Sequence, residues 1–377
     1  MILIVLFNDF NSPFLMIFFQ NNILLFIVLT IGITFILSAL FNSILLKFSQ
    51  TLGIRQQQSS EKQIRFNPTA RPSIGGISFF VIFLISFIIL NFIDHRLPLN
   101  YSSLKIIGVF VVCTIAFLMG LADDAYNTKP LLKFIAQLVC GLILYFTGTK
   151  INIFTNEALN FGLTVFWVIG IMNSINMLDN MDAITTIVSI VILLFSILLN
   201  INLNLIISPI PILSLGLLGS LLGFLIYNWY PAKMFMGDTG SQFLGAFLAV
   251  VGIDYCWNSF SLINNAWFSV NPILMGFLSI ALVFLLPITD TITVSINRIK
   301  KGQSPFIGGK DHTTHHLYFK GITEKRIAIL FCGIGMIGIS LALNQILNYQ
   351  ITWLVVSIIF CAITFVSLCY NTIIKRK

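Results

Sequence analysis

Residues 22–46 read NILLFIVLTIGITFILSALFNSILL, a run of 25 residues without a charged side chain. An α-helix of about 20 apolar residues is long enough to cross the roughly 30 Å of hydrocarbon in a bilayer. The run lacks the alternation of apolar and polar residues that strands of a membrane barrel require. It therefore predicts a membrane-spanning helix, and it decides the class of fold.

Ten further segments are also apolar and long enough to be candidate membrane spans. They lie at 74–93, 104–122, 131–147, 161–176, 184–207, 210–229, 239–256, 272–297, 326–344 and 351–370. The segment at 161–176 is the shortest. The composition agrees, because 57% of the 377 residues are hydrophobic and 9% are charged, whereas soluble domains carry about 25% charge. We expect a single all-α domain over residues 1–377, a polytopic transmembrane bundle of about 10 or 11 spans.

The basic residues favour one side of this predicted bundle. With an outside N-terminus, the cytoplasmic regions would be 47–73, 119–133, 173–183, 228–241, 298–326 and the C-terminal tail. These regions hold 18 of the 21 Lys and Arg residues. Because cytoplasmic loops are enriched in Lys and Arg, the net charge of +8 is an orientation signal rather than a nucleic-acid surface.

Three features are expected to be structural. The first twenty residues are apolar with polar interruptions and lack a basic leader or a cleavage site, so we expect an interfacial helix and no cleaved signal. The polar, proline-bearing segment at 55–73 predicts a cytoplasmic loop. The six cysteines lie mostly in apolar runs without CxxC spacing, which indicates core residues rather than a zinc site.

Six of the thirteen acidic residues gather in four short strings within the predicted cytoplasmic loops. They occur in the strings LADDAYNTKPLLKFIAQ (121–137), NSINMLDNMDAITT (173–186), MFMGDTGSQFLG (234–245) and GGKDHTTHHLYF (308–319). Ionisable groups are costly to place in hydrocarbon, so this clustering predicts a site at the cytoplasmic face of the membrane. Carboxylates beside lysines and histidines suit phosphate chemistry assisted by Mg²⁺.

The side chains in these strings suggest a role for each residue in such chemistry. Mg²⁺ is usually held by one or two carboxylates, water and substrate phosphates, and Asp238 with Asn176 could provide that minimal shell. Asp123 could remove the residual proton of an attacking phosphate, whose second pKa is about 6. Phosphoryl transfer also needs groups that neutralise charge. The candidates for that task are Lys133, His312, His315 and His316.

These strings follow a known order. They resemble DDxxxxxPxxKFxxQ, NxxNxxD, GDxGS and the cytoplasmic histidine loop of the polyprenyl-phosphate N-acetylhexosamine-1-phosphate transferase superfamily (glycosyltransferase family 4), and in particular its undecaprenyl-phosphate GlcNAc-1-phosphate transferases. RPSIGG (71–76) follows the first span, as the resemblance requires, and the likeness covers nearly the whole chain.

The resemblance implies an enzyme that depends on Mg²⁺, with Mn²⁺ as a substitute. A polyprenyl phosphate, such as undecaprenyl phosphate, would attack the β-phosphorus of a UDP-N-acetylhexosamine and release UMP, with GlcNAc-1-phosphate as the favoured group. This reaction would initiate assembly of an envelope polysaccharide or glycan. The resemblance also implies a multi-pass protein of the bacterial inner membrane whose active site faces the cytoplasm. Its partners would be the two substrates and membrane lipid, without nucleic acid, and a homodimer stays open.

The resemblance also implies roles for single residues. Asp238 and Asn176 would hold the metal, and Asp123 and Asp124 would act at the lipid phosphate and the metal. Lys133 and the histidines would contact phosphates or sugar. The nucleotide would be bound by Asp179, Asp182, Phe235 and Asn228, with Phe235 stacked on the uracil.

This chain departs from the family pattern NxxNxxDGxDGLA, because Asn180 and Ala183 stand where glycines are usual. We expect these departures to affect substrate detail before activity.

Structural alternatives stay open for these residues. Carboxylates at helix ends often cap helices, as Asp123 and Asp124 could do. Asn176 could form an interhelical hydrogen bond, Asp179 and Asp182 could face solvent, and Phe235 could pack in the core. The histidines could bind zinc. Asp290, within 272–297, is either an intramembrane functional group or a residue near the cytoplasmic end.

Two other functions fit parts of the sequence. A transporter would also be polytopic, but its charges should lie near the midplane on repeated or broken helices, and no repeat is visible. The nearer alternative is a phospho-N-acetylmuramoyl-pentapeptide transferase of the same superfamily. The histidine loop SPFIGGKDHTTHHL (304–317) is more similar to the branch that uses simple UDP-sugars.

Overall fold

The structure is a computed structural model that describes residues 22–51, 71–94, 103–262, 271–304, 309, 311–348 and 350–373. Within these ranges the chain forms helices and no strand, and one isolated parallel bridge joins Ser73 to Phe235. The all-α prediction is therefore confirmed. The helix expected in the first twenty residues and most of the polar segment at 55–73 lie outside the described residues.

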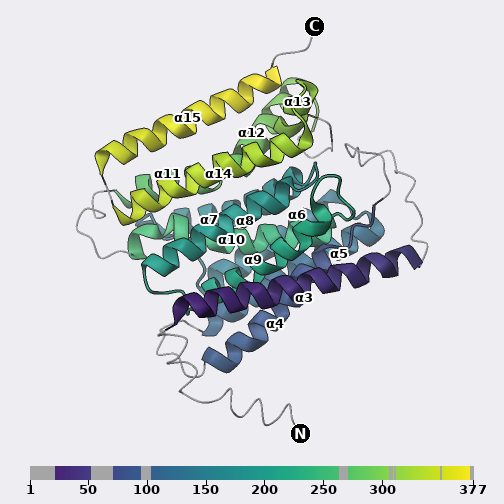
Figure 1. The fold of residues 1–377 in the computed structure, drawn as a ribbon. Coiled ribbons are helices and arrows are strands. Elements are labelled where there is room, and N and C mark those ends of the chain that lie inside the picture. The colour runs from purple at the N-terminus through teal and green to yellow at the C-terminus, as the bar shows by residue number, and fades with distance from the viewer. Residues whose placement is uncertain are drawn as a thin grey trace.

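The helices run side by side, with α15 along the top edge of the bundle and α3 near the bottom (Figure 1). In chain order they are α3 (Ile23–Thr51), α4 (Gly76–Asp94), α5 (Ser103–Tyr126), α6 (Pro130–Thr147), α7 (Glu157–Leu178), α8 (Ile184–Asn202), α9 (Pro209–Asn228), α10 (Gly237–Gly252), α11 (Pro272–Val283), α12 (Leu285–Lys300), α13 (Thr313–Phe319), α14 (Glu324–Leu347) and α15 (Ile351–Ile373). A π-helical turn, η1 (Ile253–Trp257), continues α10, and a 3-10 turn, η2 (Ser259–Leu262), follows it.

The predicted spans coincide with these helices. Among the described residues, 8 helices are long and apolar enough to cross a membrane, or up to 9 if α11 and α12 count as one bent span. The apolar part of α4 and the 16 residues of α10 are shorter. The segment expected to be the shortest belongs to α7, which has 22 residues. The protein is thus a multi-pass membrane protein.

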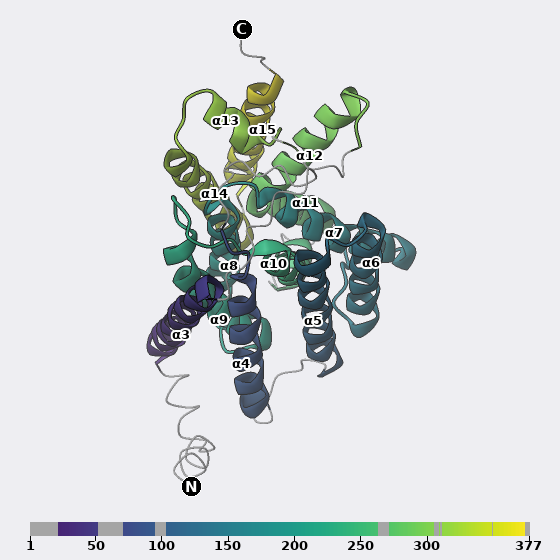
Figure 2. The same ribbon diagram turned by 90° about the vertical axis from the view of Figure 1, so that its right-hand side faces the viewer.

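One predicted span is broken. The sequence indicated a continuous helix over 272–297, whereas α11 and α12 meet at an angle of 84°. Pro287 lies in the first turn of α12 and has no N–H to donate to the carbonyl of Val283, so the helix cannot continue through this point. Figure 2 shows α12 extending away from the centre of the bundle.

Helix α10 occupies the centre of the bundle. It packs against α4, α5 and α7, and its residues after Asp238 are buried. Gly76 of α4 approaches the backbone of Gly240, and Gly120 of α5 approaches the backbone of Asp238, so closely that a Cβ at either glycine would overlap α10. This close packing places the N-terminus of α10, with Asp238, against the ends of its neighbours.

Candidate active site

The acidic motifs converge where α5, α6, α7 and α10 meet. Nζ of Lys133 lies 2.7 Å from Oδ2 of Asp238 and also forms an ion pair with Asp123. Nδ2 of Asn176 donates to Oδ1 of Asp238 at 3.0 Å. Together with Asp124, which contacts the backbone of Asp238, these residues form what we call the carboxylate cluster. The predicted convergence of the separate motifs is thus found in the structure.

Asp123 shapes the turn that brings Lys133 into the cluster. Its Oδ1 accepts hydrogen bonds from the N–H of Thr128 at 2.9 Å and from Oγ1 of Thr128 at 2.6 Å. Pro130 then starts α6, because its fixed φ suits the first helical position. Lys133 therefore emerges one turn into α6, beside the other oxygen of Asp123.

Asp124 caps a helix other than its own. Its Oδ1 accepts from the N–H of Asp238 at 3.0 Å, and its Oδ2 accepts from the N–H and Oγ1 of Thr239 at 2.8 and 2.6 Å. Gly237 has φ +71°, and a Cβ there would lie 2.5 Å from Oδ2 of Asp124, so this turn requires glycine. The structure gives Asp124 a capping role at α10, and contact with metal or lipid stays a prediction.

The carboxylate cluster is short of positive charge. Asp123 and Asp238 share one ammonium, that of Lys133, and Asp124 lies beside them at the start of α10, so the three carboxylates exceed the one lysine by two negative charges. The N-terminus of α10 offsets part of the charge of Asp124. Asn176 uses Nδ2 for its bonds to Asp238 and Ser241, so its Oδ1 remains unengaged among the described residues. A carboxylate and an amide oxygen are ligand types that suit Mg²⁺.

A metal site of another kind is not supported. No group of three or more His, Cys, Asp or Glu side chains within the described ranges is arranged to hold a metal ion. This disfavours a zinc site at the histidines. Mg²⁺ differs, because it keeps several waters and uses substrate phosphates to complete its shell.

Asp182 joins two segments around the cluster. Its carboxylate lies 3.0 and 3.2 Å from Nη1 of Arg71 and accepts from the N–H of Ala232 at 2.8 Å. The side chain is only 4% exposed. The structure therefore gives Asp182 an anchoring role, and the predicted contact with uridine would compete with these bonds.

The RPSIGG segment runs beside the residues that precede Asp238. The N–H of Phe235 donates to the carbonyl of Pro72, and the N–H of Gly75 donates to the carbonyl of Phe235, both at 3.0 Å. The guanidinium of Arg71 lies 5.5 Å from the centre of the Phe235 ring. This pairing sets the register of the chain entering α10, and stacking of Phe235 on a uracil stays a prediction.

Asn228 and Asp179 occupy different environments. Oδ1 of Asn228 accepts from Oγ1 of Thr186 at 2.7 Å, and its Nδ2 donates to the carbonyl of Met234 at 3.1 Å. This buried amide holds the loop after α9 against α8, and its predicted contact with the nucleotide stays a prediction. Asp179 follows α7 directly, half-buried and three residues after Asn176, and its contact with the nucleotide stays a prediction.

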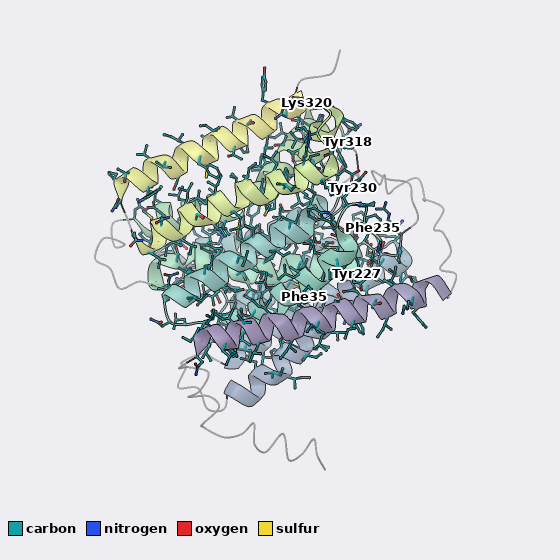
Figure 3. The ribbon with its side chains drawn as sticks, in the orientation of Figure 1. Phe35, Tyr227, Tyr230, Phe235, Tyr318 and Lys320 are labelled. Carbon is teal, nitrogen blue, oxygen red and sulfur yellow. The ribbon has the colours of Figure 1, made fainter. Side chains whose placement is uncertain are left out.

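Residues Asp311–His316 of the histidine loop pack against the end of the bundle that holds the carboxylate cluster. Asp311 pairs with Nε and Nη2 of Arg298 at 2.9 and 2.7 Å, and Oγ1 of Thr314 donates to Oδ1 of Asn180 at 2.7 Å. Asn180 lies between Asn176 and α8, so the loop reaches the neighbourhood of the carboxylate cluster. Figure 3 shows Tyr318, which follows the loop, on the same side of the molecule as Tyr230 and Phe235.

The imidazoles of this loop differ in environment. Burial, aided by the charge of His312, lowers the pKa of His315 to about 4, so His315 is neutral at pH 7. Burial also lowers the pKa of His316, and Lys301 and Lys320 add to this effect against the opposing charge of Asp311. Burial therefore disfavours the imidazolium form of His315, and its contact with the substrate stays a prediction.

Comparisons with known proteins agree with this geometry. Residues 106–256, which include the clustered residues of α5, α6, α7 and α10, match the model of glycosyl transferase family 4. Over 355 residues the chain is 28% identical to the probable undecaprenyl-phosphate N-acetylglucosaminyl 1-phosphate transferase of Bacillus subtilis (strain 168), which covers 90% of this chain and 91% of the relative. The chain is thus similar to glycosyl transferase family 4 over the residues that form the carboxylate cluster.

Other relatives in this family carry two kinds of name. The phospho-N-acetylmuramoyl-pentapeptide-transferase of Listeria innocua is 27% identical over 335 residues, which are 83% of this chain and 93% of the relative. The decaprenyl-phosphate N-acetylglucosaminephosphotransferase of Mycobacterium leprae is 26% identical over 313 residues, 76% of each chain. All three relatives are named as transferases, which supports the prediction that the chain is an enzyme.

The two departures from the family's glycine pattern have different structural consequences. Ala183 has φ 64°, in the left-handed region that glycine adopts without strain. An L-residue with a Cβ costs roughly 1 kcal/mol more there. Asn180 has no such strain, and its side chain binds Thr314 and the carbonyl of Met177. The first departure costs stability, and the second supplies a contact to the histidine loop.

Sequence reasoning missed the cations that hold the site together. Arg71 and Arg298 each pair with one carboxylate, Asp182 and Asp311 respectively. The sequence left open whether Asp290 is an intramembrane functional group or lies near the cytoplasmic end beside Asn297 and Arg298, and the structure pairs it with His312. Of Arg71, Arg298 and Asp290, only Arg71 lay in a sequence motif that could have pointed to its role. The partners of Arg298 and Asp290 lie 13 and 22 residues further along the chain, beyond a turn.

Proposed function

We propose that the protein transfers a sugar 1-phosphate from a UDP-N-acetylhexosamine to a polyprenyl phosphate and releases UMP, with GlcNAc-1-phosphate and undecaprenyl phosphate as the favoured pair. The carboxylate cluster carries this proposal, because three carboxylates, one lysine and one asparagine meet at the end of the bundle. The names of the Bacillus subtilis and Mycobacterium leprae relatives support a polyprenyl phosphate acceptor and an N-acetylglucosamine phosphate.

The negative charge of the carboxylate cluster supports the binding of a divalent cation. A diphosphate would be repelled by an excess of two negative charges, and at close range this repulsion amounts to several kcal/mol. Asp238 and Asn176 would hold Mg²⁺, with Mn²⁺ as a substitute. The bound ion would neutralise the diphosphate and make its phosphorus more electrophilic.

The side chains of the cluster would assist the displacement. An oxygen of the lipid phosphate forms a bond to the β-phosphorus, the bond from that phosphorus to the bridging oxygen breaks, and UMP leaves with the bonding electrons. Asp123 would take the residual proton of the lipid phosphate, and Lys133 would neutralise the negative charge on the phosphates. His312 and His316 would contact the phosphates or the sugar.

The location of the site is part of this proposal. The cluster and the histidine loop involve the regions at 119–133, 173–183, 228–241 and 298–326, which belong to the predicted side that holds 18 of the 21 Lys and Arg residues. The asymmetry in Lys and Arg supports a cytoplasmic active site in a bacterial inner membrane. Carboxylates at one end of the helices also disfavour a transporter, whose charged groups should lie near the midplane.

A second function has the support of another relative. The Listeria innocua relative is named a phospho-N-acetylmuramoyl-pentapeptide-transferase and is almost as similar as the Bacillus subtilis relative. Both reactions would use the same cluster, and they would differ in the sugar that is recognised. The product formed from each UDP-sugar decides between them.

The test uses purified protein in vesicles with undecaprenyl phosphate and Mg²⁺. UDP-GlcNAc, other UDP-amino sugars and UDP-MurNAc-pentapeptide are supplied separately, UMP is quantified, and the lipid product is identified by mass spectrometry. We expect UMP and a lipid-linked diphospho-GlcNAc from UDP-GlcNAc. A product from UDP-MurNAc-pentapeptide alone would select the second function, and uptake without UMP release would reject both.

A further inference from the structure

Asp290 is buried, at 1% exposure, within α12, and the proposed reaction gives it no part. An ionised carboxylate in such a place is costly unless hydrogen bonds and an opposite charge compensate it. Its presence therefore depends on what it contacts.

Both oxygens of Asp290 bind the start of the histidine loop. Oδ2 lies 2.8 Å from Nδ1 of His312. Oδ1 accepts from the N–H of Thr313 at 2.8 Å and from Oγ1 of Thr313 at 2.7 Å. One carboxylate thus contacts an imidazole ring and the backbone beside it.

These bonds select one form of the His312 ring. Because the carboxylate acts as an acceptor, the proton of its bond to the ring belongs to Nδ1. Nε2 is then the ring nitrogen that can meet a ligand. A carboxylate that binds one imidazole nitrogen fixes both the tautomer and the orientation of the ring.

Helix α12, which carries Asp290, is held against α7 by hydrogen bonds. Oγ of Ser174 on α7 donates to the carbonyl of Pro287 at 2.7 Å and contacts Oγ1 of Thr291, also at 2.7 Å. Ser174 lies two residues before Asn176 on α7, so α12 is attached to the helix that supplies part of the carboxylate cluster. The position of His312 relative to the cluster is therefore set through α7 and α12.

We infer that Asp290 is a positioning residue for the transfer: it holds the Nδ1–H of His312 and thereby presents Nε2 to the phosphates or sugar of the substrate. The inference rests on the proposed function, and Asp290 acts only through His312. The pair of Arg298 and Asp311 braces the same loop.

The first test is Asp290→Asn, which keeps the size of the side chain and removes its charge. Loss of such a supporting contact typically reduces activity about 10- to 100-fold, and we expect kcat for UMP release to fall by that amount while KM for UDP-GlcNAc changes less than about threefold. Thr313→Val is the matched control, because it removes a hydrogen bond to the same carboxylate and leaves the ring contact. Its kcat should stay within about threefold of the unaltered protein.

A double-mutant cycle separates positioning from general support of the fold. If Asp290 acts through His312, then Asp290→Asn adds no further loss of kcat in a His312→Ala background. A further loss as large as in the single variant would show that Asp290 acts independently of the ring, and would overturn the inference.

A readout without turnover completes the test. Nitrogen-15 NMR of histidine-labelled protein in nanodiscs, assigned with His312→Ala, should show Nδ1 of His312 protonated in the unaltered protein, with an altered Nδ1 signal in Asp290→Asn. An unprotonated Nδ1 in the unaltered protein would overturn the inference even if the enzyme is active. An inactive protein with Nδ1 protonated would instead reject the proposed function.

Discussion

Charged residues lie near both ends of α5, α6 and the continuous helix of α10 and η1. The positive and negative charges match in number at one end and not at the other. On α5, Lys105 and Asp123 lie about 27 Å apart at 1.5 Å per residue. Lys105 pairs with Asp254 of η1 at 2.8 Å, and Lys150 after α6 pairs with Glu157 at 3.0 Å. At the other end, Lys133 alone serves two carboxylates, with Asp124 beside them.

This difference separates structural charges from functional ones. A pair of one lysine and one carboxylate needs no further ion, whereas a shared lysine leaves negative charge for a cation. The pairs Arg71–Asp182 and Arg298–Asp311 around the cluster are also one to one. Among these pairs, the excess of negative charge is confined to the carboxylate cluster.

The largest effect is expected from Asp238→Asn, because it removes a carboxylate that we propose as a metal ligand. UMP release should fall at least about 100-fold, and chelation of Mg²⁺ should have a similar effect that added Mg²⁺ or Mn²⁺ reverses. Asp254→Asn at the far end is the matched control and should retain kcat within about twofold. Full activity of Asp238→Asn would reject its metal role.

Replacing Lys133 or Lys105 by alanine tests the same difference between the two ends of the helices. Lys133→Ala leaves the cluster without its ammonium, so kcat should fall by about 30- to 100-fold with little loss of folded protein. Lys105→Ala leaves the buried Asp254 without its partner, so the free energy of unfolding should fall by about 1–3 kcal/mol while kcat is maintained. Equal effects of the two variants on kcat would contradict the functional difference between the ends.

Acidification should act through the histidine loop. The pKa of His315 is lowered to about 4 in the folded protein, below its ordinary value of 6.5, so the unfolded chain takes up the proton first. Stability is therefore unaffected above about pH 6.5 and falls between about pH 6.5 and 4, by about 3 kcal/mol in total. Denaturation across this range should show a smaller pH dependence in His315→Gln, and hydrogen exchange should rise first in α13. An unchanged pH dependence in that variant would contradict the assignment.

The smallest expected effect is a gain in stability at the turn before α8. Ala183→Gly relieves a positive φ and should raise the free energy of unfolding by up to about 1 kcal/mol, because the folded strain exceeds the entropy that glycine adds to the unfolded chain. The reverse change at another positive φ, Gly148→Ala at φ 100°, should lower the free energy of unfolding. A loss of stability in Ala183→Gly would show that the strain at this turn is compensated.

The amino-acid sequence alone was enough to predict the all-α membrane architecture, the positions of the helices and the members of the carboxylate cluster. Those features follow from local properties, namely the length of apolar runs, the cost of charge in hydrocarbon and the spacing of motifs. Only the folded bundle revealed the bend between α11 and α12, the capping of α10 by Asp124 and the pairing of Asp290 with His312. The same is true of the contact between Asp182 and Arg71, which are 111 residues apart. Which partner a buried charge finds depends on which helix ends meet, and that is settled by packing across the whole bundle.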